Sequence, residues 1–433
     1  MNYYSLNKKA PNVDFKEATI QGQAPDKGLY FPEKLPVVDK NLIRYIENLP
    51  DAEIAYRVIA PYTGNTIPDL QLFDIVKETI NFPIPLQPVS ERISSLELFH
   101  GPTLAFKDVG ARFMSRCLGY FLKNENRQVT VLVATSGDTG GAVANGFYNV
   151  KGINVVILYP RNRVSPVQEK QLTTLGNNIT ALEVDGSFDD CQQMVKQAFI
   201  DKDIQEKLFL TSANSINVAR WLPQQFYYFM AYKQWQPKDR PPVVCVPSGN
   251  FGNICAGLLA KATGLPLGHF VAACNVNDIV SDYLRTSALV PKEASPTLSN
   301  AMDVGNPSNF VRIIELFGQQ FPTLKTNLSS YTITDEETLT TIKRVYNQYQ
   351  YLLEPHGAVA YQALDRYLQA AANENGFILE TAHPVKFPQA VEYATGQNIS
   401  IPDSLIPLLL KEKQSFLIKP VYDHFKQFLL RNS

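Results

Sequence analysis

The chain has 433 residues, of which 45% are hydrophobic and 19% are charged, the composition of a soluble globular protein with room for two or three domains. Its 40 basic and 41 acidic residues leave a net charge of -1, so no overall field attracts nucleic acid or an anionic membrane. No apolar run reaches the roughly 20 residues of a membrane span and no secretory signal opens the sequence, which predicts a cytoplasmic protein that binds neither membrane nor nucleic acid.

The first 95 residues are irregular. Pro and Gly are scattered through QGQAPDKGLYFPEKLP and PYTGNTIPDL, and both residues interrupt helices and strands and favour turns. We expect a mixed, partly helical N-terminal domain over residues 1–95.

Segments typical of strands and helices alternate from residue 129 to residue 201. Short apolar runs are followed by helix-like segments, and Ser187 with Asp190 resembles the capping box that begins a helix. This alternation favours a parallel sheet with helices on both faces. The expected strands cover 129–134, 153–160 and 178–186, and the expected helices cover 165–176 and 187–201.

A second unit of the same kind begins near residue 241. An apolar run is followed by the loop SGNFGN (248–253) and by a helix-like segment, so this loop occupies the same place as ATSGDTGG (134–141) in the first unit. Ligands of open parallel sheets bind beyond the carboxyl ends of the strands, where such loops lie. We expect the two loops to face each other across one site.

Lys107 stands in an unusual context, LFHGPTLAFKD, directly after Leu104, Ala105 and Phe106. One interpretation is a surface lysine whose aliphatic stem lies along apolar neighbours. The other is a buried lysine, because burial lowers the pKa of the amine and so favours imine formation with an aldehyde cofactor.

The loop SGNFGN also has two interpretations. It is either a tight strand-to-helix turn or a site where backbone N–H groups at a helix N-terminus bind a phosphate. It matches neither G-x-G-x-x-G nor the P-loop pattern. A phosphate-bearing aldehyde would explain both the loop and the lysine, and pyridoxal phosphate is such a molecule.

Five stretches, in this order, resemble the motifs of the threonine synthases of the long bacterial and fungal type: FHGPTLAFKD, ATSGDTGGAV, TSANSINVAR, VPSGNFGN and TAHPVKF. That family belongs to the tryptophan-synthase-β-like, fold type II pyridoxal-phosphate enzymes. The resemblance implies an α/β fold with two parallel-sheet domains plus an N-terminal domain. The implied segments are 1–95, a small domain at 96–215 with the lysine and the SGDTG loop, and a large domain at 216–433 with SGNFGN and C-terminal helices.

The resemblance also implies an activity and roles for residues. The family converts O-phospho-L-homoserine and water to L-threonine and phosphate, by γ-elimination followed by addition of water at the β carbon. Lys107 matches the Schiff-base lysine and general acid and base, and Thr381 matches the hydroxyl that faces the pyridine nitrogen, which would leave that nitrogen largely unprotonated. Ser248, Gly249, Asn250, Phe251, Gly252 and Asn253 match the loop that holds the cofactor phosphate. Ser136, Gly137, Thr139 and Gly140 match the loop that receives the substrate carboxylate.

Asp138 departs from the wider fold type, in which many relatives carry Asn beside the 3′ oxygen of the cofactor. An acidic residue beside a phenolate repels it unless a proton is shared. The protonation state and role of Asp138 are therefore open at this stage.

The phosphate of the substrate needs cations of its own. Arg220 begins a helix-like segment after several amide and hydroxyl side chains, and a guanidinium with such donors suits phosphate recognition. The alternative is a helix cap formed by Ser215 or Asn217, with Arg220 solvated. The candidates for substrate binding are Arg220, Ser212, Asn214, Asn217 and Lys386, with Arg112 as a further candidate.

Other chemistry is less favoured by the sequence. The five cysteines form no CxxC pair and no His/Cys cluster has zinc-ligand spacing, which predicts reduced thiols and no metal site. His100, His356 and His383 are expected to hydrogen-bond within the core or loops rather than to act as catalytic bases. We expect a monomer or a weak dimer.

Three alternative functions follow from the same motifs. A threonine or serine dehydratase or a cysteine synthase would share the lysine and the loops, but the GPTLAFKD and NSIN…R motifs favour a phosphorylated substrate. A serine-protease-like hydrolase is suggested by GDTGG, yet Thr139 stands where the nucleophilic serine should be. A non-catalytic relative is disfavoured by the intact lysine and loops.

Overall fold

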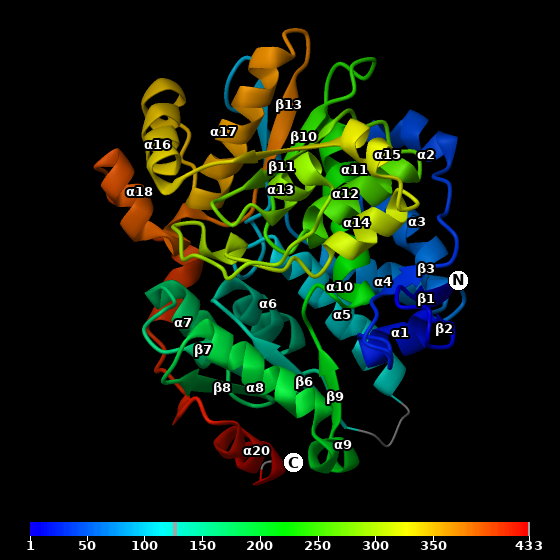
Figure 1. Ribbon diagram of the computed structural model, residues 1–433, viewed down its shortest axis with the longest axis vertical. Coiled ribbons are helices and arrows are strands. Elements are labelled where there is room, and N and C mark those ends of the chain that lie inside the picture. The colour runs from blue at the N-terminus through cyan, green and yellow to red at the C-terminus, as the bar shows by residue number, and fades with distance from the viewer. Residues whose placement is uncertain (124–127, 432–433) are drawn as a thin grey trace.

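The computed structural model describes residues 1–123 and 128–431. These residues form two sheets of mainly parallel strands, each with its own helices, and a small antiparallel sheet beside them. Figure 1 shows the larger sheet in the upper half, the smaller parallel sheet in the lower half, and the N-terminal elements at the right, in blue. The expected α/β architecture with two parallel sheets and an additional N-terminal region is confirmed.

The larger sheet has six strands in the order β12-β11-β10-β13-β5-β4, parallel except that β4 is antiparallel to β5. Its central strands are apolar runs buried on both faces, as expected when helices cover a parallel sheet on both sides. The strands are β4 (Leu86–Pro88), β5 (Ile93–Glu97), β10 (Val243–Pro247), β11 (Phe270–Cys274), β12 (Leu328–Thr332) and β13 (Gly376–Glu380).

The smaller sheet has five parallel strands in the order β14-β8-β7-β6-β9. The alternation read from residues 129–201 is confirmed, and Ser187 and Asp190 form the expected capping box. The edge strand β14 comes from the end of the chain and pairs with β8, so the C-terminal segment returns to the smaller sheet. The strands are β6 (Val129–Ala134), β7 (Ile153–Pro160), β8 (Ile179–Val184), β9 (Phe209–Ser212) and β14 (Phe416–Ile418).

The N-terminal region contains a three-stranded antiparallel sheet in the order β2-β1-β3. Asp14 caps the first helix through its carboxylate, which accepts the backbone N–H of Glu17. The strands are β1 (Asn2–Ser5), β2 (Val13–Asp14) and β3 (Tyr30–Pro32), and the helices are α1 (Phe15–Gln21), α2 (Lys40–Tyr45), α3 (Asp51–Thr63) and α4 (Asp69–Thr79).

Helices cover the two parallel sheets. They are α5 (Lys107–Leu122), α6 (Asp138–Phe147), α7 (Pro166–Thr173), α8 (Phe188–Ile200), α9 (Lys202–Lys207), α10 (Val218–Trp221), α11 (Gln225–Gln234), α12 (Gly252–Ala262), α13 (Ile279–Thr286), α14 (Phe310–Leu316), α15 (Phe321–Asn327), α16 (Asp335–Tyr349), α17 (Pro355–Ala370), α18 (Pro388–Thr395), α19 (Ile406–Leu409) and α20 (Tyr422–Arg431). Short 3₁₀ turns lie at Ile46–Asn48, Leu222–Gln224, Asn300–Met302, Pro384–Lys386 and Asp403–Leu405.

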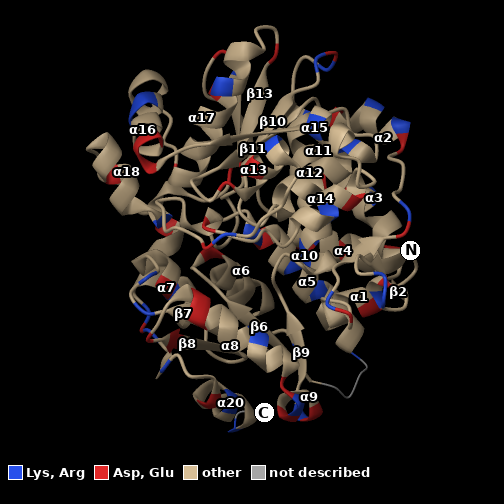
Figure 2. Cartoon of the chain, in the orientation of Figure 1, with Lys and Arg blue, Asp and Glu red and all other residues tan. Residues whose placement is uncertain are grey.

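Basic and acidic residues are interspersed along the chain, as Figure 2 shows, in keeping with the near-zero net charge. Within residues 1–123 and 128–431, no helix is long and apolar enough to cross a membrane. The five cysteines are all buried and unpaired.

Arg312 is a fully buried cation at the junction of three parts of the chain. Its guanidinium donates to the carbonyls of Tyr30 (3.1 Å) and Ile216 (2.6 Å) and to the side-chain oxygen of Asn309 (2.7 Å), and it stacks 4.3 Å above the ring of Trp221. Burial lowers its pKa to about 10. This one side chain therefore ties the N-terminal sheet to the loop before α10 and to α14.

We expect Arg312→Met to lower the free energy of unfolding by about 3 kcal/mol, because several buried acceptors lose their donors at once. The midpoint of chemical denaturation measures this change. The control is Arg285→Met on α13, whose side chain is 75% exposed; it should change stability by no more than about 0.5 kcal/mol. Equal effects of the two substitutions would contradict this account of Arg312.

Candidate active site

Lys107 begins helix α5 at a turn that the end of β13 holds in place. The backbone N–H of Phe106 donates to the carbonyl of Thr381 at 2.8 Å, and Ala105 forms a β-bridge with Ala382. The main chain on the N-terminal side of the lysine is thus fixed against the larger sheet.

Asp108 closes the turn from the other side. Its carboxylate accepts the backbone N–H of Thr103 at 2.9 Å and the Thr103 hydroxyl at 2.5 Å, while Leu104 between them takes a left-handed conformation (φ 56°). The PTLAFKD sequence is therefore a closed loop whose geometry determines where α5, and with it Lys107, begins.

The amine of Lys107 lies in a desolvated position among four charged side chains. Burial lowers its pKa, the charges of Lys386 and Arg220 lower it further, and Asp138 and Glu354 act in the opposite direction. The positive end of the α5 dipole also disfavours an ammonium at this position. Lys107 is half-buried as a residue while its amine is desolvated, so the geometry favours the buried-lysine interpretation over the surface one, and such an amine is a competent nucleophile and base.

The ATSGDTGG loop is organised by a residue that precedes its glycines. The hydroxyl of Thr135 accepts the backbone N–H groups of Gly137 (3.0 Å) and Gly140 (2.9 Å). Gly137 has φ 133°, and a Cβ there would stand 2.5 Å from the Gln168 side chain, so the turn requires glycine. The candidates Ser136, Gly137, Thr139 and Gly140 thus lie at the N-terminus of α6, the positive end of its dipole.

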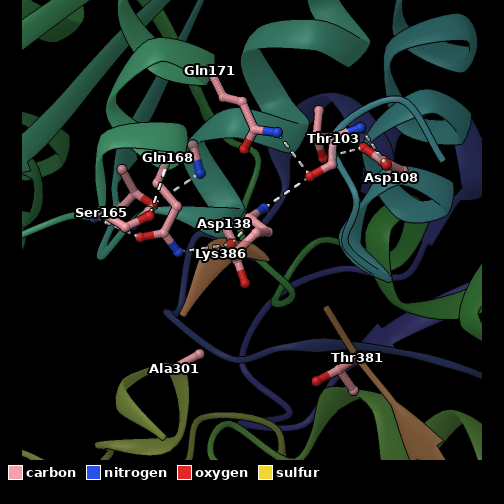
Figure 3. Close-up of polar contacts among 12 residues, drawn as sticks. Thr103, Asp108, Asp138, Ser165, Gln168, Gln171, Ala301, Thr381 and Lys386 are labelled. Carbon is pink, nitrogen blue, oxygen red and sulfur yellow. Dashed lines mark hydrogen bonds and ion pairs between the residues drawn. The ribbon is translucent and has the colours of Figure 1, made fainter. Parts of the chain in front are cut away.

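Asp138 and Lys386 form a buried ion pair between the two halves of the molecule. Asp138 begins α6 beside the smaller sheet, Lys386 follows β13 of the larger sheet, and the Nζ–Oδ1 distance is 2.7 Å. Lys386 also donates to the carbonyl of Thr103 at 2.9 Å, and Gln168 donates to Asp138 at 2.9 Å. Figure 3 shows this chain of contacts running from Ser165 through Asp138 and Lys386 to Thr103 and Asp108.

The pair determines the charge of Asp138. Burial by itself opposes ionisation, but Lys386 and Lys107, together with the hydrogen bond from Gln168, hold the pKa of Asp138 well below its usual range. Asp138 is therefore an ionised carboxylate at neutral pH. The sequence left the protonation state of Asp138 open. Lys386, which lies far from Asp138 in the chain, decides it.

The SGNFGN loop connects β10 to α12. Gly249 packs so tightly that a Cβ there would stand 2.7 Å from the Cα of Met302. Phe251 takes a left-handed conformation (φ 61°), held by burial of its ring against Phe310 at 5.5 Å between centroids. The loop thereby reaches the N-terminus of α12 with Gly252 as the first helical residue.

The hydrogen-bond partners of the SGNFGN side chains indicate whether this loop can bind a phosphate group. Asn250 is held by Ser308, whose hydroxyl donates to its side-chain oxygen at 3.2 Å. Asn253 accepts the Tyr228 hydroxyl at 2.8 Å, but its buried Nδ2 has no hydrogen-bond partner among the described residues. An unused amide donor in the first turn of α12, together with the desolvated Lys107 amine, fits a phosphate-bearing aldehyde. The loop residues Ser248, Gly249, Asn250, Phe251, Gly252 and Asn253 and the lysine are therefore compatible with pyridoxal phosphate.

Thr381 follows β13 and is 7% exposed. Its hydroxyl donates to Oε1 of Glu354 at 3.3 Å, and Glu354 in turn caps α17 by accepting the backbone N–H groups of His356 and Gly357. The hydroxyl thus contacts a carboxylate that the sequence did not single out.

Arg220 lies in the short helix α10 and is 4% exposed. Its Nε and Nη1 have no hydrogen-bond partner within the described residues, and burial lowers its pKa to about 10. A buried guanidinium without a counter-ion is costly and points to an anion from outside the chain. The solvated alternative for Arg220 is therefore wrong.

The side chains before Arg220 have structural partners. Asn217 caps α10 through its Oδ1 and donates its amide to the carbonyl of Thr19 at 2.9 Å, so the helix-cap interpretation is confirmed for this residue. Ser212 accepts the backbone N–H of Asn214 at 3.3 Å, and Ser215 accepts from Asn309. Asn217 thus supports the loop, while Arg220 keeps unused donors.

Arg112 and the three histidines lie in other contacts. Arg112 donates to Asn81 at 3.0 Å, towards the end of α4. His100 pairs with Glu97 at 2.7 Å, His356 with Glu354 at 2.6 Å, and His383 accepts the backbone N–H of Val385 at 3.1 Å. Burial lowers the pKa of His383 to about 4. The expectation that these histidines hydrogen-bond within the structure is confirmed.

Sequence reasoning missed four residues that position the others: Thr135, Gln168, Asp108 and Glu354. Thr135 and Asp108 stand inside the quoted motifs, so the preference of Thr and Asp for side-chain-to-backbone bonds in turns was an available signal. Glu354 precedes Pro355 and a helical segment, which is the pattern of a helix cap. No local signal connects Gln168 with Asp138.

Comparisons with known proteins agree with this geometry. Family models match residues 2–80 (threonine synthase N terminus), 90–379 (pyridoxal-phosphate dependent enzyme) and 357–429 (threonine synthase, C-terminal). A threonine synthase of Haemophilus influenzae is 46% identical over 418 residues, which is 95% of this chain and 96% of that protein.

Two solved structures have the same fold over their whole length. Pyridoxal-phosphate-bound threonine synthase from Brucella melitensis has a TM-score of 0.93 and 35% identity, covering 100% of this chain and 99% of that one. Threonine synthase from Escherichia coli has a TM-score of 0.92 and 40% identity, covering 100% of both chains. With the desolvated amine of Lys107, two glycine-rich loops and an identity of 46% to a relative over almost its full length, the chain belongs to the threonine synthase family of pyridoxal-phosphate-dependent enzymes.

Proposed function

We propose that this enzyme acts on O-phospho-L-homoserine and water and releases L-threonine and phosphate, by elimination at the γ carbon followed by addition of water at the β carbon. Arg220 is the observation that carries the proposal: a buried guanidinium with two unpaired donors, near the Lys107 amine, calls for an anionic substrate group. Phosphate release from O-phospho-L-homoserine by the purified enzyme tests it.

When bound, pyridoxal phosphate supplies the electron sink that stabilises negative charge on the carbon next to the substrate amino group. Lys107 is the residue that we assign to covalent attachment and to proton transfer. Its lowered pKa increases the share of the neutral amine, which is the form that can remove the proton from the α carbon, and the resulting ammonium can return protons at later stages.

The two loops hold the anionic groups. The N-terminus of α12 and the residues 248–253 bind the cofactor phosphate through backbone N–H groups and the unused amide of Asn253. Residues 136–140, at the N-terminus of α6, receive the substrate carboxylate. Each helix dipole favours the negative group placed at its positive end.

Arg220 binds the substrate phosphate, and Lys386 neutralises Asp138. The Lys386 ammonium is buried and already contacts Asp138 and the Thr103 carbonyl, so its role is to neutralise a carboxylate that would otherwise repel an anionic substrate. Ser212 and Asn214, in the segment before α10, are further candidates for contact with the substrate.

A threonine or serine dehydratase is the second candidate, since it would use the same lysine and loops. The unpaired Arg220 favours a substrate with a phosphate, which a dehydratase does not need. Ammonia release from L-threonine or L-serine without phosphate release would favour the dehydratase.

We also propose a cytoplasmic location and a monomeric or weakly dimeric state. Buried, unpaired cysteines suit a reducing compartment. Sedimentation at increasing protein concentration tests the oligomeric state.

Lys107→Ala should abolish the visible absorbance that bound pyridoxal phosphate has in the wild-type protein, and should abolish phosphate release, because no other amine occupies this position. The absorbance spectrum measures the bound cofactor after the protein has been loaded with pyridoxal phosphate and the unbound cofactor has been removed by dialysis. The control, Lys343→Ala on the exposed face of α16, should retain the spectrum. An unchanged spectrum in Lys107→Ala would remove the lysine from its assigned role.

Arg220→Met separates binding from folding. Loss of two charge-assisted hydrogen bonds to phosphate should raise KM for O-phospho-L-homoserine roughly 10- to 100-fold. Because an unpaired buried charge is removed, the substrate-free protein should be no less stable than the wild type. Steady-state kinetics and denaturation of the same preparation give both results, with Arg285→Met as the control. A large loss of stability with an unchanged KM would assign Arg220 a structural role instead.

Lys386→Met leaves Asp138 buried without its cation, so we expect the free energy of unfolding at pH 7 to fall by about 3 kcal/mol. In this variant burial raises the pKa of Asp138 above its unfolded value. The deficit should therefore shrink as the pH falls through that raised pKa, since protonation removes the buried charge. Denaturation curves between pH 4 and pH 8 measure it. The double variant Asp138→Asn/Lys386→Met should recover stability at pH 7, and a deficit independent of pH would contradict the assignment.

A further inference from the structure

Asn309, the residue just before α14, contacts both the SGNFGN loop and the segment that leads to α10. It is fully buried. Helix α12, which begins in the loop, packs against both α10 and α14 (Figure 1). The loop is assigned to the cofactor phosphate, and α10 carries Arg220, which is assigned to the substrate phosphate. A residue that holds both elements therefore affects two sites for anions.

The start of α14 and the residues before it hold the SGNFGN loop at three points. The Ser308 hydroxyl donates to the side-chain oxygen of Asn250 at 3.2 Å, and the backbone N–H of Asn309 donates to the Asn250 carbonyl at 3.2 Å. The ring of Phe310 packs edge-on against the ring of Phe251. A left-handed conformation such as that of Phe251 is unfavourable for a residue with a bulky side chain, so the loop requires this support.

The side chain of Asn309 points to the segment before α10. Its Nδ2 donates to the Ser215 hydroxyl at 2.9 Å, and its Oδ1 accepts Nη1 of Arg312 at 2.7 Å. Arg312 also donates to the carbonyls of Ser215 (3.2 Å) and Ile216 (2.6 Å). Because a guanidinium only donates hydrogen bonds, Oδ1 must face Arg312 and Nδ2 must face Ser215. The orientation of the Asn309 amide is therefore fixed.

Gly252, the first residue of α12, lies where the loop and the segment meet. A Cβ at Gly252 would stand 3.2 Å from the Cβ of Ser215 and 3.3 Å from Nδ2 of Asn309. The backbone that begins α12 thus packs directly on the hydrogen-bonded pair. A displacement of Asn309 is therefore passed to the N-terminus of α12.

Backbone hydrogen bonds continue from this segment to Arg220. The N–H of Asn217 donates to the carbonyl of Asn214 at 3.1 Å, and the N–H of Arg220 donates to the carbonyl of Asn217 at 3.0 Å. Arg220 keeps Nε and Nη1 without partners among the described residues, and Asn253 in the first turn of α12 likewise keeps its Nδ2. The contacts of Asn309 therefore lead to unused buried donors on both sides.

We propose that Asn309 is a positioning residue that fixes the SGNFGN loop and the segment leading to Arg220 relative to each other, so that phosphate binding at either element depends on the same amide. This inference rests on the proposed roles of the loop and of Arg220 in binding the two phosphates. The amide of Asn309 is engaged at both ends, so it acts through Ser215 and Gly252 and not on either anion.

Asn309→Ala in the protein loaded with pyridoxal phosphate tests this. Loss of the amide should shift the ³¹P NMR resonance of the cofactor phosphate and raise the dissociation constant of pyridoxal phosphate roughly 5- to 10-fold, the effect of one lost hydrogen bond. Titration of the holoenzyme with inorganic phosphate reports on Arg220. This binding should weaken by a similar factor, because the segment that places Arg220 loses its support.

The control is Asn178→Ala, beside the smaller sheet. The Asn178 amide also holds main chain, since it donates to the carbonyls of Phe147 and Ile153 at 2.9 Å and accepts the N–H of Asn149 at 2.8 Å. This variant should lose stability but keep the ³¹P resonance and both dissociation constants. If Asn309→Ala behaves in the same way, Asn309 has a structural role alone and the proposal is overturned.

Ser215→Ala is a second variant, which decides the matter if Asn309→Ala does not fold. It removes the acceptor of the Asn309 amide and keeps the Cβ that packs beside Gly252. It should also shift the ³¹P resonance of the cofactor phosphate, and an unchanged resonance overturns the proposal. Where both variants fold, Ser215→Ala should shift the resonance no further in the Asn309→Ala background, because the same bond is already lost. Additive shifts would contradict the proposal.

An effect on the cofactor phosphate alone, or on inorganic phosphate alone, overturns the proposal as well, because Asn309 would then serve one element. A wild-type holoenzyme that binds no inorganic phosphate removes Arg220 from its role and the inference with it. None of these measurements uses the reaction. If the wild type passes them but releases no phosphate from O-phospho-L-homoserine, the proposed reaction fails and the role of Asn309 stands.

Discussion

The buried ion pair between Asp138 and Lys386 is the contact on which the arrangement of this site depends. It joins the first residue of α6, beside the smaller sheet, to the segment after β13 in the larger sheet. Because both charges are out of water, each requires the other, and the pair holds the ATSGDTGG loop against the segment that follows β13. Lys386 also donates to Thr103, so the turn that presents Lys107 is held by the same cation.

Charge is distributed unevenly around Lys107. Asp138 has its cation and Glu354 has the N-terminus of α17, whereas Arg220 has two donors without partners. Nearby cations and desolvation together favour the neutral form of the Lys107 amine. Unpaired donors on Arg220 and a lowered pKa of Lys107 are two properties that suit the proposed chemistry on a phosphorylated amino acid.

The motifs predicted much of the local geometry because they encode short-range constraints. The SGNFGN loop does begin a helix, the alternation after residue 129 does form a parallel sheet, and Ser187 does cap a helix. The three expected segments of the chain exchange strands in the structure. Strand β5 (Ile93–Glu97) pairs with β13 of the larger sheet, and β14, from the end of the chain, pairs with β8 of the smaller sheet. Pairing between strands far apart in sequence leaves no periodic signal in either strand.

The sequence by itself determined the fold class and the family, and it singled out the lysine and the two loops as candidates, since each depends on residue types at short spacings. Only the tertiary structure decided the charge of Asp138, the capping role of Asn217 and the link from Thr381 to Glu354. Those depend on partners such as Lys386, Thr19 and Glu354, which lie at least 27 residues away in the chain. The pKa of a side chain and the partner of a hydrogen-bond donor are set by groups within a few ångströms. Only folding brings residues so far apart in the chain to that distance.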